Sequence, residues 1–118
     1  MILFENVSKT YGEREALSDI SFKIEPGEFI FVVGPSGAGK STISKLLIRE
    51  VQATTGKIMV GEYDYSQVKR KDIPYLRRQI GIVFQDNKLL PDRTVAENIA
   101  LSLEILKKKP AAIASTIE

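Results

Sequence analysis

A glycine-rich octapeptide directly after an apolar run constrains the fold of this chain more than any other feature. Residues 34–41 read Gly-Pro-Ser-Gly-Ala-Gly-Lys-Ser, and Phe-Ile-Phe-Val-Val precedes them at 29–33. This spacing fits the pattern G-x-x-x-x-G-K-[ST], which is typical of a phosphate-binding loop between a buried strand and a helix. The alternative is a plain glycine turn, but four constrained positions together make a chance match uncommon.

The residue types in this loop suit the binding of a nucleoside triphosphate. Glycines at 34, 37 and 39 let the backbone wrap closely around phosphate oxygens. The exposed amides and the N-terminal end of the following helix would form an anion cradle. Lys40 is expected to reach the β- and γ-phosphates, and the Ser41 hydroxyl to bind Mg²⁺. We therefore predict ATP and Mg²⁺ as ligands; GTP fits the same motif.

The composition indicates a soluble globular protein of one small domain, with 118 residues of which 43% are apolar. A formal net charge of +2 gives no argument for nucleic acid as a partner. Basic clusters at 69–71, 77–78 and 107–109 fit solvated faces or, alternatively, a rim facing lipid headgroups or a membrane-embedded partner. The chain has no cysteine, no apolar stretch near 20 residues and no signal-peptide pattern, which favours the cytoplasm.

Hydrophobic periodicity predicts an α/β fold. Strands are expected at 2–7, 20–24, 29–33, 57–61 and 80–84. The runs at 29–33 and 80–84 are continuously apolar, as in parallel strands covered on both faces. Helices are expected at 40–51, 72–79, 94–108 and 111–118. Asp72 and Thr94 are the predicted N-caps, and Thr94 begins the capping box Thr-Val-Ala-Glu.

Three further features bear on a nucleotide site. Tyr11 lies 23 residues before Gly34 and either stacks on an adenine ring or packs on its own loop. Gln85 follows a predicted buried strand, where it either reaches Mg²⁺ and the attacking water or makes a strand-end hydrogen bond. The loop 86–94 carries a pair of leucines that either dock on their own core or meet a partner.

In this order and spacing, Tyr11, Gly34–Thr42 and Gln85 resemble the ATP-binding-cassette (ABC) ATPases over essentially the whole chain. The resemblance implies a P-loop NTPase core with an N-terminal antiparallel β subdomain, and a helical subdomain from about residue 94. It also implies that Ser41 and Gln85 hold Mg²⁺. The implied nucleotide contacts are Tyr11, Gly34, Pro35, Ser36, Gly37, Ala38, Gly39, Lys40, Ser41, Thr42 and Gln85.

The segments 27–42 and 73–101 are most similar to the cell-division members of this family. Such members imply a cytoplasmic homodimer at the inner face of the cell membrane and an integral membrane subunit of the FtsX type. Contact with that subunit is expected through about Gln85–Thr94, and the implied role is septal peptidoglycan remodelling. The sequence Asp-Arg-Thr-Val at residues 92–95 favours this group over the lipoprotein-release and macrolide-export ATPases, which are the alternative.

Several motifs of the family do not occur in these 118 residues. There is no Leu-Ser-Gly-Gly-Gln signature, no Walker B strand with a catalytic glutamate, and no histidine. The resemblance therefore covers about half of such a domain, which we expect to be truncated before these motifs. Loss of a general base costs about 10²–10⁴ in rate, so we expect ATP binding with very slow hydrolysis and no catalytic residue. A truncated, non-hydrolytic nucleotide-binding module is the third hypothesis.

Overall fold

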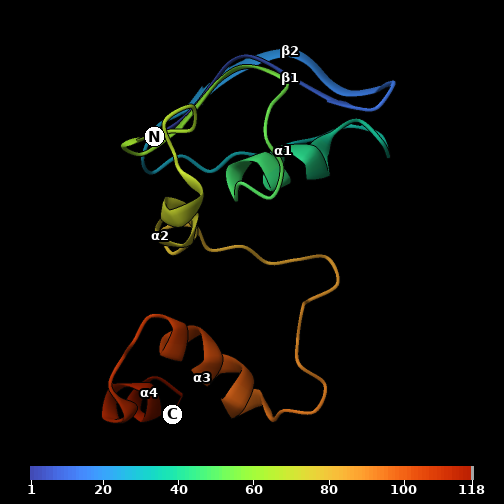
Figure 1. The fold of residues 1–118 in the computed structure, drawn as a ribbon. Coiled ribbons are helices and arrows are strands. Elements are labelled where there is room, and N and C mark those ends of the chain that lie inside the picture. Colours follow the sequence, from blue (N-terminus) through green and yellow to red (C-terminus); the bar gives the residue numbers. More distant parts are fainter. Residues whose placement is uncertain (118) are drawn as a thin grey trace. The chain divides into compact units, whose positions relative to one another are not determined.

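The computed structural model describes residues 1–117 of this chain. They form two compact units, one from Met1 to Ile80 and one that begins at Gly81 (Figure 1). The first unit holds the antiparallel sheet and two helices, and the second holds two further helices. Within residues 1–117, no helix combines the length and hydropathy needed to cross a bilayer.

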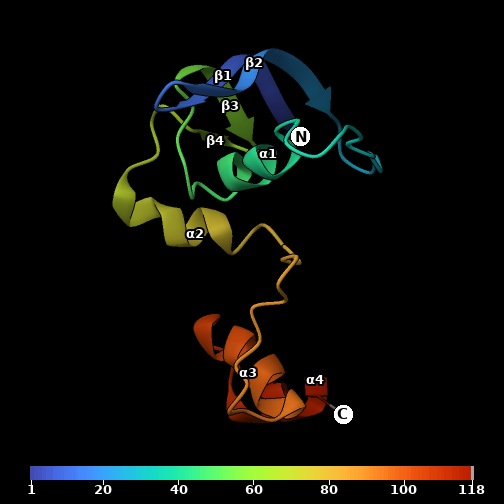
Figure 2. The same ribbon diagram turned by 90° about the vertical axis from the view of Figure 1, so that its right-hand side faces the viewer.

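A four-stranded antiparallel sheet forms the upper layer of the first unit (Figure 2). Its strands are β1 (Ile2–Tyr11), β2 (Arg14–Ile24), β3 (Thr55–Val60) and β4 (Tyr63–Asp64), in the order β2-β1-β3-β4. The predicted antiparallel subdomain is therefore confirmed. Strands β1 and β2 extend beyond the predicted strands, because a tight turn at residues 12–13 replaces the expected loop.

An irregularity in β1 sets which side chains reach the core. Asn6 has φ +48° and Asp19 on β2 has φ +46°, and the register of the β1–β2 pair shifts between Phe4 and Val7. The side-chain Nδ2 of Asn6 donates to Asp19 Oδ1 at 2.9 Å, which holds the two irregular positions together. Phe4 and Val7 are both fully buried although they are three residues apart, because the extra residue reverses the alternation.

Helix α1 (Lys40–Leu47) lies along one face of the sheet, as both ribbon views show. Helix α2 (Ile73–Arg77) follows a 3₁₀ turn, η1 (Arg70–Asp72). Asp72 is the N-cap residue of α2, as predicted, and Pro74 lies in the first turn, but the Asp72 side chain makes no capping bond within residues 1–117. The buried apolar cluster consists of Phe4, Val7, Leu17, Leu46, Ile58, Tyr65 and Leu76.

Helix α1 ends earlier than its apolar periodicity predicts. Arg49 has φ +57°, its amide donates to Leu46 O, and the Glu50 amide donates to Lys45 O. These two bonds form a Schellman motif, which satisfies the last carbonyls of the helix and turns the chain away. Val51 continues the periodicity but lies beyond the helix, packed against the core from the following loop.

Two predicted strands, 29–33 and 80–84, do not form. Both segments lack strand structure, and Phe29, Val33 and Val83 are 82%, 86% and 92% exposed. A strand exists only through the ladder it makes with a neighbour, and the described residues supply no strand beside either run. The sequence pattern identified segments suited to a buried sheet but could not identify their pairing partners.

The second unit contains α3 (Val95–Ile105) and α4 (Pro110–Ile117). The predicted capping box is confirmed: the Glu97 amide donates to Thr94 Oγ1 at 3.2 Å, and the Thr94 amide donates to Glu97 Oε2 at 2.7 Å. The Thr94 amide and the Thr94 hydroxyl both donate to the Glu97 carboxylate, and these two bonds hold the pKa of Glu97 below its usual value. Helix α3 ends before residue 108, at a second Schellman motif centred on Lys107. Helix α4 begins at Pro110, and the last predicted helical residue, Glu118, lies outside the described residues.

Replacing Gly56 by alanine is expected to destabilise the first unit by about 2–4 kcal/mol. Gly56 has φ +88°, and an added Cβ would lie 2.3 Å from the Asn6 carbonyl oxygen. Urea unfolding measures the loss. Gly61→Ala is the control, because Gly61 has φ +56° but open space around it; it should cost only about 1–2 kcal/mol. Equal losses in the two variants would contradict the steric argument.

Candidate functional site

The phosphate-binding loop leads directly into α1, with Gly39 as the N-cap residue. Gly39 has φ +88°, and an added Cβ would lie 2.4 Å from Ala16 O on β2. The Gly39 carbonyl accepts from the amides of Thr42 and Ile43 at 2.9 and 3.1 Å. Among the described residues, no backbone acceptor faces the amides of Lys40 and Ser41. Free amides and the positive end of a helix dipole favour an anion, and binding of phosphate by these residues stays a prediction.

Lys40 folds back over the loop from the first position of α1. Its ammonium donates to Gly34 O and to Pro35 O, at 2.6 Å each. The side chain is neither fully exposed nor buried. A single positive charge is therefore held between the helix N-terminus and the start of the loop, where the triphosphate is expected.

The two hydroxyl residues after Lys40 differ in their surroundings. Ser41 is exposed, and its hydroxyl has no hydrogen-bond partner among residues 1–117. Thr42 is buried, with 8% of its surface exposed. Hydroxyl and amide oxygens are ligands that Mg²⁺ accepts, so Ser41 is accessible for the role predicted for it.

The end of the β1–β2 hairpin lies against the phosphate-binding loop. Tyr11 ends β1, is 41% exposed, and pairs across the hairpin with Arg14. A Cβ added at Gly37 would lie 3.4 Å from Arg14 Nη2, so the guanidinium reaches the loop. The hairpin thus brings the Arg14 cation to the predicted nucleotide site, and Tyr11 is its partner across the hairpin. Tyr11 lies in a strand and not in the expected loop, and Lys9 Nζ lies 4.9 Å from its ring centroid.

The sequence reasoning missed Arg14. The sequence feature that could have identified Arg14 is its position opposite Tyr11 across a two-residue turn. That position follows once Gly12 and Glu13 are assigned to the turn.

Gln85 belongs to the second unit. It is exposed and follows an extended segment without strand structure, and the next residues turn where the Asn87 amide donates to Phe84 O at 3.0 Å. The joint role of Gln85 and Ser41 at Mg²⁺ therefore stays a prediction. The loop 86–94 is exposed throughout, as expected from its polar composition.

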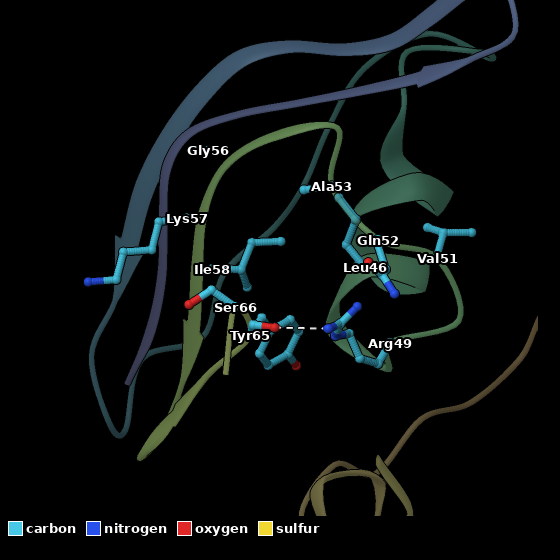
Figure 3. A pocket seen from close by; sticks show the side chains of 10 residues that line it. All are labelled: Leu46, Arg49, Val51, Gln52, Ala53, Gly56, Lys57, Ile58, Tyr65 and Ser66. Atoms are coloured by element: carbon cyan, nitrogen blue, oxygen red, sulfur yellow. Dashed lines mark hydrogen bonds between the residues drawn. The ribbon is translucent and has the colours of Figure 1, made fainter. Parts of the chain in front are cut away.

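A cavity of about 440 Å³ lies between the C-terminal end of α1 and β3 (Figure 3). The Arg49 guanidinium points into it and donates to Tyr65 O at 2.8 Å. The Tyr65 hydroxyl donates to the Leu47 carbonyl at the end of α1. Because Lys40 lies at the opposite end of this helix, the cavity is separate from the phosphate-binding loop.

Comparison with known proteins identifies the family. Residues 17–118 match the ABC transporter family, which is most of the chain. The chain belongs to this family. The ABC match includes the phosphate-binding loop, α1 and the segment around Gln85.

Two curated ABC relatives are cell-division ATP-binding proteins FtsE. The protein from Bacillus subtilis (strain 168) is 50% identical over 114 residues, which cover 96% of this chain and 50% of the relative. The protein from Mycobacterium tuberculosis (strain H37Rv) is 43% identical over 115 residues, with 96% and 50% coverage. The chain thus spans about half the length of the curated relatives it matches.

A solved ABC structure shows the same fold. The ATP-binding cassette MJ0796, in a dimeric post-hydrolysis state bound to ADP and Pi, matches with a TM-score of 0.87 and 32% identity. The match covers 99% of this chain and 54% of the cassette. The predicted fold class, an ABC cassette with an N-terminal antiparallel subdomain, is therefore confirmed.

Tyr65 is expected to make the first unit sensitive to alkaline pH. Burial raises the pKa of Tyr65 to about 12, from 10.0 for the ordinary side chain. The folded state therefore favours the protonated phenol, so stability is fully present below pH 10 and falls as the pH rises from 10 through 12. Urea midpoints measured across this range should fall less steeply for Tyr65→Phe than for the unmodified chain.

Tyr75→Phe is the matched control, because Tyr75 is 59% exposed. It should leave the alkaline slope unchanged. A Tyr65→Phe slope equal to that of the unmodified chain would contradict the assignment.

Proposed function

We propose that this chain is the ATP-binding part of an FtsE-like ABC ATPase. The observation that carries the proposal is the phosphate-binding loop, which combines the Lys40 ammonium and the N-terminus of α1 at one place. The identity of 43–50% to the FtsE proteins of Mycobacterium tuberculosis and Bacillus subtilis supports the cell-division assignment.

Each site residue has a proposed task. Tyr11 stacks on the adenine ring, the residues from Gly34 to Thr42 surround the phosphates, and Lys40 neutralises the β- and γ-phosphates. Arg14 adds a second cation beside the loop, consistent with the approach of its Nη2 to Gly37. Ser41 and Gln85 hold Mg²⁺, whose chemistry when bound is to neutralise phosphate charge.

The full protein is proposed to work as a homodimer with an FtsX-like integral membrane subunit. The dimeric state of the MJ0796 cassette supports the homodimer. In this proposal the protein lies at the cytoplasmic face of the membrane, and residues 85–94 contact the FtsX-like subunit. ATP binding and hydrolysis are thereby coupled to septal peptidoglycan remodelling.

Lys40→Ala tests the nucleotide site directly. Removing one charged partner of the phosphates should weaken Mg-ATP binding by about 10–100-fold, since hydrogen bonds to charged groups contribute about 1.5–3 kcal/mol. Isothermal titration calorimetry with Mg-ATP measures the change.

Lys45→Ala is the control for this test, because Lys45 lies on the same helix with only a 3.8 Å ion pair to Glu50. The affinity of the Lys45→Ala variant for Mg-ATP should equal that of the unmodified chain. If the unmodified chain does not bind Mg-ATP, or if both variants bind equally well, the proposal is wrong.

Arg14→Gln tests the cation that the hairpin contributes. Mg-ATP affinity should fall by up to about tenfold, because one exposed charge near the phosphates is lost. Arg78→Gln removes an exposed guanidinium that lies over the Tyr75 ring, and should have no effect. An unchanged affinity in Arg14→Gln would exclude Arg14 from the site while leaving the Lys40 test intact.

A further inference from the structure

The side chain of Asn98 joins the first part of α3 to the preceding loop by four hydrogen bonds. Its Oδ1 accepts from the Leu90 amide at 2.9 Å. The two hydrogens of its Nδ2 are shared among three acceptors, Leu90 O at 3.2 Å, Arg93 O at 3.2 Å and Thr94 O at 2.9 Å. One amide group therefore binds both backbone groups of Leu90 and two more carbonyls before the helix.

The capping box fixes the same end of the loop independently. Thr94 exchanges backbone and side-chain bonds with Glu97, so residue 94 is held to the first turn of α3. That box does not reach Leu90, four residues earlier. Within residues 1–117, the connection of Leu90 to α3 by side-chain hydrogen bonds runs through Asn98.

The loop held in this way presents apolar side chains and has an unusual backbone. Leu89 is 67% exposed and Leu90 is 40% exposed. Asn87 and Lys88 have φ values of +55° and +50°, in the left-handed region that non-glycine residues seldom adopt. A short polar loop with this backbone would sample many conformations without bonds that fix it.

We infer that Asn98 is a positioning residue that orders the loop 86–94 before any partner arrives. The inference rests on the proposed function in one respect: the partner that uses the ordered loop is the FtsX-like membrane subunit. A loop that is already ordered loses less conformational entropy on binding, so the Leu89–Leu90 pair is presented at lower cost. A loop ordered only part of the time binds more weakly, in proportion to the time it spends in the binding conformation.

Asn98→Ala separates this role from a general effect on the helix. Alanine has a higher helix propensity than asparagine, so α3 should keep its helicity while all four bonds to the loop are lost. Ser102→Ala is the matched control, because among residues 1–117 the Ser102 hydroxyl bonds only within α3, to Ile99 O. Circular dichroism monitors the helicity of both variants.

Two readouts are compared in the unmodified chain and the two variants. Amide hydrogen exchange at Leu90, measured by NMR, should become at least about tenfold faster in Asn98→Ala and stay unchanged in Ser102→Ala. Affinity for the detergent-solubilised FtsX-like subunit should fall at least about tenfold in Asn98→Ala alone.

The two readouts fail in different ways. Unchanged exchange at Leu90 in Asn98→Ala would overturn the positioning role. Faster exchange with unchanged partner affinity would overturn the use of the ordered loop in binding. If the unmodified chain does not bind the membrane subunit, the proposed partnership is wrong, while the exchange measurement still decides whether Asn98 orders the loop.

Discussion

The packing of α1 against the antiparallel sheet is the interaction on which the proposed nucleotide site depends. Leu46 is fully buried among side chains of the sheet, and burying a leucine contributes about 1.5–3 kcal/mol. At the other end of the helix, Gly39 lies so close to Ala16 and Leu17 that no side chain fits between them. These contacts fix the direction of α1, and with it the position of the amides and the lysine that are proposed to face the phosphates.

Features that depend on nearby residues could be predicted from the sequence. The phosphate-binding loop and the capping box are defined by residue types at fixed offsets, and both have the expected local geometry. Features that depend on distant partners could not. The run 29–33 has the composition of a buried strand but no neighbour among the described strands. Arg14 reaches Gly37 through the hairpin register, in which the shift near Asn6 is reversed between Val7 and Lys9 and a further shift follows between Lys9 and Thr10.

Helix ends were a further source of error, for a specific physical reason. Both α1 and α3 end at a residue in the left-handed conformation, and these residues are Arg49 and Lys107. Glycine is the usual residue at such positions, so the sequence carries no visible stop signal there. Apolar periodicity continues past the end of α1, because Val51 still packs against the core from the following loop. Asn98 was missed likewise, since its hydrogen bonds connect it to loop carbonyls and to no recognisable motif.

The Lys40 ammonium already donates to two loop carbonyls, and these carbonyls would compete with a phosphate for it. In the proposed site, a phosphate that bonds to Lys40 would displace Gly34 O and Pro35 O from its ammonium. The contribution of Lys40 to the proposed nucleotide affinity would therefore be the difference between two sets of hydrogen bonds to one cation. Such an exchange gives a smaller net enthalpy than a new contact, and it keeps the loop closed on its lysine when no nucleotide is bound.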